Sequence, residues 1–322
     1  MAFDATSGIP SEGVGESAPA SPARMNAFFG PKGLRAGWRI LIFLGLTVGI
    51  GAALSIPLKV IPGAKAYLAA IADHQKHGIV TPLDALLSEG LAVLAVLGAA
   101  AIMTLIEKRS FADYALPWNQ AFGKRFWQGF VLGFAMLSVL LVAILALHGF
   151  SLEGLAVNGS TAVRFGFEWA IVFFLAAVSE DFTFRGYLQS ALGDGIGFWP
   201  AALVLAVVFG GIHYSNTNEA IFGCVMAGSF GLLEAFALSR VGSLWLLFGM
   251  HLSWDWAETF FYGTPDSGAV GLGHLFNSSF HGPQWLTGGT VGPEGSWLVL
   301  GVLLLWALAI HFLFPKGASA AT

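Results

Sequence analysis

The chain has 322 residues, of which 56% are hydrophobic and only 11% are charged, and its mean hydropathy is +0.73. This composition lies outside the usual range of soluble domains and predicts an integral membrane protein. The formal net charge of −4 is spread along the chain, which excludes the basic surface of a nucleic-acid-binding protein. A single cysteine, Cys224, excludes an intrachain disulfide and a thiol pair for metal or redox chemistry.

The N-terminal segment, residues 1–33, is rich in Gly, Ser, Ala and Pro and has no basic residue before Arg24. It also lacks an apolar core ahead of a cleavage site, so we predict a disordered cytoplasmic tail and not a signal peptide. Residues 34–316 are expected to form one membrane domain, followed by a short tail at 317–322.

Windows that can cross about 30 Å of hydrocarbon need about 20 apolar residues each. Eight such windows occur, at 38–58, 84–106, 126–148, 165–190, 198–216, 219–239, 243–262 and 296–314. Gly, Pro or charged residues separate them, as expected for loops. We therefore expect an all-α, polytopic fold with about eight transmembrane helices.

Lys and Arg predict the orientation of these helices, because cytoplasmic loops carry an excess of both. With a cytoplasmic N-terminus, eleven of the fifteen basic residues lie on the inner side, and the loop 263–295 contains none. We expect both termini in the cytoplasm of a multi-pass cell-membrane protein, most simply in a bacterial inner membrane.

Three of the predicted spans contain ionisable residues. An ionised side chain in hydrocarbon costs about 2.5 to 3.5 kcal/mol on insertion scales, so such residues usually face a cavity or one another. The fourth span contains Glu180, Asp181 and Arg185, the fifth contains His213, and the seventh contains His251 and Asp255. They indicate a polar site within the membrane.

Counting residues from the connecting turns at 1.5 Å per residue places Glu180, His213, His251 and Asp255 at a common depth. Asp181 and Arg185 are four residues apart and can form an ion pair on one helix face. This leaves Glu180 on a neighbouring face, where it could act with His213. A carboxylate beside an imidazole in a low-dielectric cavity can serve as a general base on water and hydrolyse an amide.

The segments "SEDFTFRG", "FGGIH" and "HLSWD" resemble the three motifs of the CAAX prenyl endopeptidase and bacteriocin-processing (CPBP, or ABI) family of intramembrane proteases. The motif core is 165–262, and the resemblance extends over roughly residues 34 to 314. It implies that Glu180 activates water with His213, while His251 and Asp255 face the tetrahedral oxyanion. It further implies supporting roles for Asp181 and Arg185, and activity without a metal or another cofactor.

Two positions depart from the family pattern. Asp181 replaces the usual second glutamate and is one methylene shorter. Asp255 stands where prenyl-processing members carry Asn, and an ionised carboxylate would repel an oxyanion. Asp255 is therefore expected either to be protonated or to orient His251.

Other interpretations of these residues remain open. They could form a buried polar network that fixes helix register, or a zinc site, although no His-Glu-x-x-His helix is present. The fold could also serve a non-catalytic scaffold or immunity protein. Glu168, Glu234 and Glu258 lie within or near spans, where packing is the commoner role. The expected partners are membrane lipid and a peptide or membrane-anchored protein substrate, with no nucleic acid and an undetermined oligomeric state.

Overall fold

The computed structural model describes residues 28–30, 33–216, 218 and 220–315. Residues 1–27 of the predicted N-terminal tail and the predicted tail at 317–322 lie outside the described residues. Phe29–Gly30 (β1) pairs antiparallel with Gly33–Leu34 (β2). This short ladder lies at the end of the predicted N-terminal tail, whose disorder stays a prediction.

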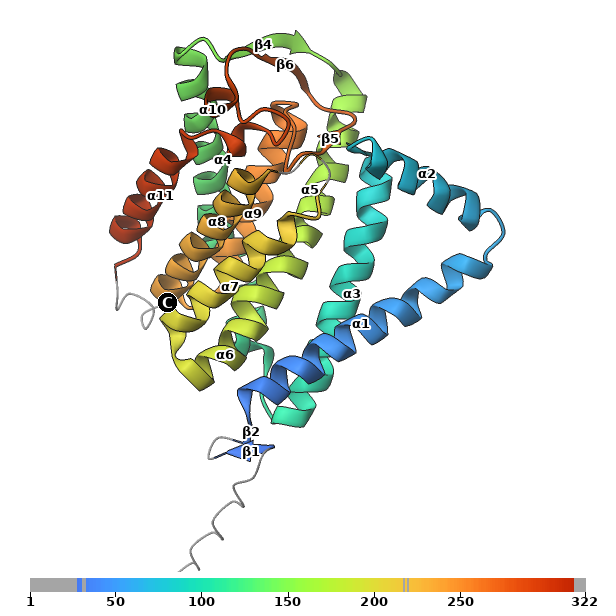
Figure 1. The fold of residues 1–322 in the computed structure, drawn as a ribbon, viewed down its shortest axis with the longest axis vertical. Helices are drawn as coiled ribbons and strands as arrows, with labels where there is room; N and C mark the ends of the chain where they lie inside the picture. The colour runs from blue at the N-terminus through green and yellow to red at the C-terminus, as the bar shows by residue number, and fades with distance from the viewer. Residues whose placement is uncertain (1–27, 31–32, 217, 219, 316–322) are drawn as a thin grey trace, which may run out of the picture.

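The fold is mostly helical, as Figure 1 shows. Its main helices are α1 (Ala36–Val60), α3 (Pro82–Glu107), α4 (Lys124–Ala146), α5 (Gly159–Asp181), α6 (Gln189–Ile196), α7 (Phe198–His213), α8 (Ile221–Val241), α9 (Leu244–Trp256) and α11 (Val299–Leu313). Two π-helical segments, η3 (Phe182–Leu188) and η4 (Ala257–Phe261), continue α5 and α9. Through η3, α5 and α6 form one continuous helical rod, Gly159–Ile196.

Within the part of the chain that the structure describes, five helical segments are long and apolar enough to cross a membrane, which agrees with the predicted membrane location. They are Ala36–Val60, Pro82–Glu107, Lys124–Ala146, Gly159–Ile196 and Ile221–Val241. The other three predicted spans correspond to α7, α9 and α11, which have 16, 13 and 15 residues. At 1.5 Å per residue these helices are shorter than 30 Å, so the count of eight spans stays a prediction.

Several elements lie where the sequence predicted only loops. Helix α2 (Ala64–Lys76) follows α1, and β3 (Ile79–Val80) pairs parallel with β5 (Val270–Gly271). Strand β4 (Phe150–Leu155) pairs antiparallel with β6 (Phe276–Phe280), and α10 (Gln284–Thr287) lies beyond it. In Figure 1 these strands and α10 gather at one end of the helices. The loop 263–295 is thereby tied to the chain before α3 and after α4.

Glycines bring α4 and α9 into direct backbone contact. A Cβ atom on Gly133 would lie 2.2 Å from the carbonyl oxygen of Met250, and one on Gly249 would lie 2.1 Å from that of Phe126. No side chain fits at such distances, so only glycine allows this approach. The contact fixes the part of α9 that carries His251.

Buried charges join the helices near the start of α1. Arg39 Nη2 lies 2.7 Å from Glu107 Oε2, and Arg39 Nη1 lies 2.7 Å from Asp194 Oδ2. Tyr187 donates a 2.5 Å hydrogen bond to Glu107 Oε1. This network connects α1 and α3 to η3 and α6, and so holds the rod that carries Glu180.

Candidate active site

The predicted site residues on α5 and α9 adjoin the two π-helical segments. Glu180 and Asp181 are the last residues of α5, and Arg185 lies within η3. Asp255 is followed two residues later by the start of η4. A π-helical turn holds more residues than an α-helical turn and changes the direction of the side chains that follow, which is why such turns are frequent at functional sites.

His251 lies among three carboxylates. Its Nδ1 is 3.3 Å from Asp181 Oδ2, and its Nε2 is 3.2 Å from Asp255 Oδ2. The same Nε2 is 4.0 Å from Glu180 Oε2. Because ionised carboxylates only accept hydrogen bonds, this arrangement suits an imidazole ring that donates from both nitrogens.

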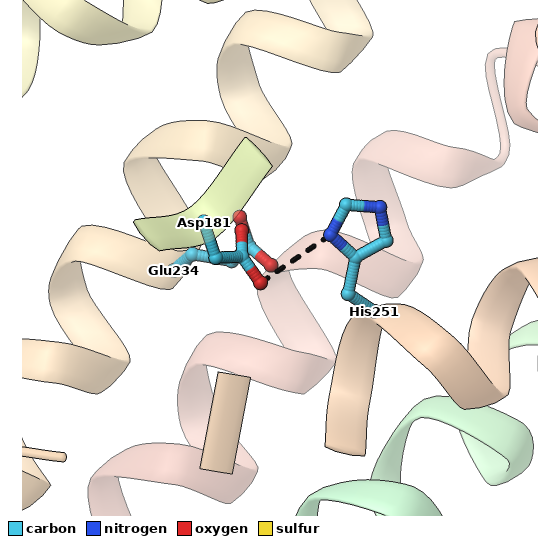
Figure 2. A group of neighbouring side chains, drawn as sticks. All are labelled: Asp181, Glu234 and His251. Atoms are coloured by element: carbon cyan, nitrogen blue, oxygen red, sulfur yellow. Dashed lines mark hydrogen bonds and ion pairs between the residues drawn. The ribbon is translucent and has the colours of Figure 1, made fainter. Parts of the chain in front are cut away.

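Arg185 forms the ion pair that the sequence predicts and a second one that it does not. Its Nη1 lies 3.2 Å from Asp181 Oδ1, and its Nη2 lies 2.8 Å from Glu234 Oε2 on α8. The guanidinium also lies 4.2 Å from the centre of the Phe209 ring. Figure 2 shows the Asp181 and Glu234 carboxylates side by side, facing the ring of His251. Arg185 therefore balances two buried carboxylates.

One cavity of about 540 Å³ is lined by Glu180, His213, His251 and Asp255. The four catalytic residues predicted from sequence thus reach the same space from the α5, α7 and α9 helices. The Glu180 side chain is 37% exposed and that of Asp181 is 0% exposed. Glu180 faces the cavity, whereas Asp181 faces the protein interior.

His213 is the last residue of α7 and lies on the cavity wall. Its Nδ1 lies 2.7 Å from the carbonyl oxygen of Phe209, so Nδ1 donates and Nε2 is the acceptor in a neutral ring. The sequence expectation paired Glu180 with His213. In the structure, the imidazole within 4.0 Å of the Glu180 carboxylate is that of His251.

Sequence reasoning missed several acidic residues of the cavity, among them Glu89, and assigned no site role to Glu234. Glu89 on α3 lines the cavity, and its Oε2 accepts a 3.2 Å hydrogen bond from Ser179 Oγ. Glu234 also lines the cavity and binds Arg185. Each lies in an apolar window and has no charged neighbour three or four residues away. The only available signal was its presence in a predicted span.

The zinc interpretation requires a group of ligand atoms that lie close together, and among the described residues one such group near the cavity contains a histidine. One atom each from Asp181, Glu234 and His251 lies within 4.8 Å of the others. The Arg185 guanidinium already pairs with both carboxylates, so an ion there would have to displace a buried cation. Among the described residues, no such group contains both His213 and His251. The ligand set with two histidines is therefore not assembled.

Comparison with known proteins agrees with the motifs. No curated protein matches the chain. Residues 162–257 match the family model described as type II CAAX prenyl endopeptidase Rce1-like. The matched segment runs from α5 to the first residue of η4 and contains all six site residues predicted from the sequence. Over residues 162–257, the chain is therefore similar to Rce1-like type II CAAX prenyl endopeptidases, as the three motifs indicate.

Proposed function

We propose that this protein is an intramembrane endopeptidase in which Glu180 activates a water molecule for attack on a peptide bond. One observation carries the proposal. Glu180 and His251, whose side chains approach to 4.0 Å, line a cavity of about 540 Å³ together with His213 and Asp255. Small-ligand sites commonly measure about 300 to 1,000 Å³, so the cavity can hold a short peptide segment and a water molecule.

In the proposed mechanism, Glu180 removes a proton from water while the oxygen attacks the carbonyl carbon of the substrate. Glu180 then returns the proton to the leaving amine when the carbon–nitrogen bond breaks. His213, whose ring is fixed by the Phe209 carbonyl through Nδ1, lies on the cavity wall and orients the same water in this proposal. The water is thereby oriented from two sides.

His251 is proposed to stabilise the oxyanion of the tetrahedral intermediate. Its ring lies between Asp181 and Asp255, which favour a doubly protonated, positively charged imidazole. A fixed positive charge beside Glu180 is available where negative charge develops on the substrate carbonyl. Asp255 then orients His251 and does not itself contact the oxyanion, which gives a reason for an Asp at this position.

We further propose that the protein crosses the membrane about eight times, with both termini in the cytoplasm of a bacterial cell. The cavity would then lie within the bilayer, and the substrates would be prenylated or otherwise membrane-anchored peptides. The absence of Lys and Arg from the loop 263–295 supports this orientation.

The test compares Glu180→Gln with the wild-type protein in proteoliposomes that contain quenched fluorescent peptides, with and without a prenyl group. We expect at least a 100-fold loss of cleavage, as removal of a general base typically causes. Glu168→Gln is the control, because Glu168 is 40% exposed, pairs with Arg164 and is not among the cavity-lining residues.

In cells, Glu180→Ala should cause uncleaved membrane peptides to accumulate, which would identify the substrates. An unchanged peptide set together with an unchanged phenotype would favour the scaffold or immunity interpretation. Inhibition of the wild-type protein by chelators, with stoichiometric zinc in the purified sample, would favour the metalloprotease.

A further inference from the structure

A second group of carboxylates lies beyond the candidate active site. Glu258 belongs to η4, Asp266 to the following loop, and Glu294 to the 3-10 turn η5 (Pro293–Gly295). One oxygen of each lies within 4.8 Å of the others. Three acidic groups that converge from distant points of the chain repel one another unless a positive charge or protons compensate them.

The carboxylate of Glu258 is fully buried. Glu258 is 0% exposed, and neither of its oxygens has a hydrogen-bond partner among the described residues. The sequence has no Lys or Arg between positions 241 and 315. A buried carboxylate in this setting needs a partner from outside the chain or must be neutralised, because burial strongly disfavours an isolated charge.

The other two carboxylates are oriented by donors. Thr259 Oγ1 donates a 3.0 Å hydrogen bond to Asp266 Oδ2. The backbone nitrogen and the hydroxyl of Ser267 each donate a 2.7 Å bond to Glu294 Oε1. Hydrogen bonds of this kind favour the ionised form of a carboxylate and fix its direction, as donors around metal ligands do.

At Gly292 the backbone carbonyl oxygen of Pro265 comes close to the Glu258 carboxylate. A Cβ atom at this position would lie 2.2 Å from the carbonyl oxygen of Pro265 and 3.2 Å from Glu258 Oε1. Gly292 also has a φ of +114°, which L-residues with a side chain rarely adopt. A backbone carbonyl and three carboxylates form a ligand set of oxygen alone, which suits Ca²⁺ or Mg²⁺ and not zinc.

We propose that Glu258, Asp266 and Glu294 bind one hard divalent cation, preferentially Ca²⁺, which fastens the loop 263–295 to the end of α9. Ca²⁺ is preferred because it accepts irregular sets of carboxylate and carbonyl oxygens, whereas Mg²⁺ demands regular geometry and retains several waters. Asp266 and Glu294 line the cavity, which provides a path for the ion. The proposal concerns binding and stability and is independent of proteolysis.

Protonation of the carboxylates is the alternative way to compensate their negative charge. Burial, together with the nearby carboxylates of Asp255 and Glu294, raises the pKa of Asp266. Acid would therefore stabilise the group in the absence of a cation, whereas Ca²⁺ stabilises it at neutral pH. Lowering the pH therefore favours compensation by protons, whereas adding Ca²⁺ at pH 7 favours compensation by the cation.

The experiment uses the full-length protein in detergent at pH 7, treated with EGTA and then freed of chelator. Calorimetric titration with CaCl₂ is expected to give one bound ion per chain. Thermal unfolding should shift upward by about 5 °C at a Ca²⁺ concentration of 100 times Kd. MgCl₂ should give a smaller shift, and KCl at equal ionic strength should give none.

Glu258→Gln keeps the size of the side chain and removes one charge. It should abolish Ca²⁺ binding, and in EGTA it should unfold at or above the wild-type temperature because like-charge repulsion is reduced. Glu168→Gln is the matched control and should respond to Ca²⁺ as the wild-type protein does. Because Glu258→Gln is expected to stay folded in EGTA, its loss of Ca²⁺ binding would not be a consequence of unfolding.

A wild-type protein without a Ca²⁺ response would overturn the proposal, above all if lowering the pH from 7 to 5 raises its unfolding temperature. The same holds if Glu258→Gln responds to Ca²⁺ like the wild type. A larger shift with Mg²⁺ would overturn the preference for Ca²⁺. None of these results depends on peptide cleavage, so the proposed protease activity can fail or succeed separately.

Discussion

Asp255 Oδ2 lies 3.2 Å from Nε2 of His251, one turn earlier on the same helix. Because Asp181 Oδ2 lies 3.3 Å from Nδ1, the imidazole ring is fixed at both nitrogens. The two carboxylates come from different helices, so the ring orientation depends on how α5 and α9 pack. This relationship supports an orienting role for Asp255.

Asp255→Asn should reduce peptide cleavage by about tenfold. The amide oxygen can still accept a hydrogen bond from Nε2, but the bond is no longer charge-assisted, which costs about 1.4 kcal/mol. Asp255→Ala should lose more, because no acceptor remains. Rates of peptide cleavage in proteoliposomes measure both. Cleavage by the Asn variant at or above the wild-type rate would instead favour a direct hydrogen bond from position 255 to the oxyanion.

Arg185→Gln should destabilise the protein by roughly 3 to 5 kcal/mol, because it leaves the carboxylates of Asp181 and Glu234 buried without a cation. Thermal unfolding in detergent measures the effect. Arg164→Gln is the matched control, since Arg164 also pairs with an acid four residues away, on the same helix, but is 63% exposed. An exposed pair contributes about 0 to 1 kcal/mol. Equal effects of the two substitutions would contradict the prediction.

Gly249→Ala should separate α4 from α9, because the new methyl group would lie 2.1 Å from the Phe126 carbonyl oxygen. Overpacking of this kind typically costs about 1 to 3 kcal/mol, and the displacement of His251 should also reduce cleavage. Gly45→Ala on α1 serves as the control, since a Cβ there meets nothing within 4 Å. That variant should be neutral or slightly stabilised, because Ala favours a helix more than Gly does. Unfolding temperatures that fall equally in both variants would count against the close contact.

Asp84→Asn should loosen α2 from the start of α3. Asp84 Oδ2 lies 2.8 Å from His74 Nδ1, and Oδ1 accepts a 2.9 Å hydrogen bond from Tyr67. Hydrogen exchange of the amides of residues 64–76 should become at least tenfold faster, as expected when about 1.4 kcal/mol of local stability is lost. Asp73→Asn is the control, because the Asp73 side chain is 71% exposed. Unchanged exchange after Asp84→Asn would show that other contacts hold α2.

The positions of the long helices were predictable from local composition. The windows 84–106 and 126–148 differ by at most two residues at either end from α3 and α4. Apolar content over about 20 residues is sufficient for such a prediction. Helix α2 and the paired strands β4 and β6 were not found, because short elements depend on partners that lie far away in the sequence.

The ion pair of Asp181 with Arg185 could also be anticipated, because helix geometry places residues i and i+4 on one face. The contact of Arg185 with Glu234 spans two helices and has no local signature. The same holds for the approach of Glu180 to His251. Packing of different helices decides these contacts.

The amino-acid sequence alone determined that this protein belongs in a membrane, and it determined which family motifs and which polar residues the membrane helices carry. These properties depend on composition and on spacing within one helix. Only the tertiary structure decided which carboxylate faces which nitrogen of His251, that Glu258, Asp266 and Glu294 meet, and that α4 touches α9. Each of these depends on the rotation and separation of packed helices. Backbone contacts such as that at Gly249 set this geometry, and no local sequence pattern encodes it.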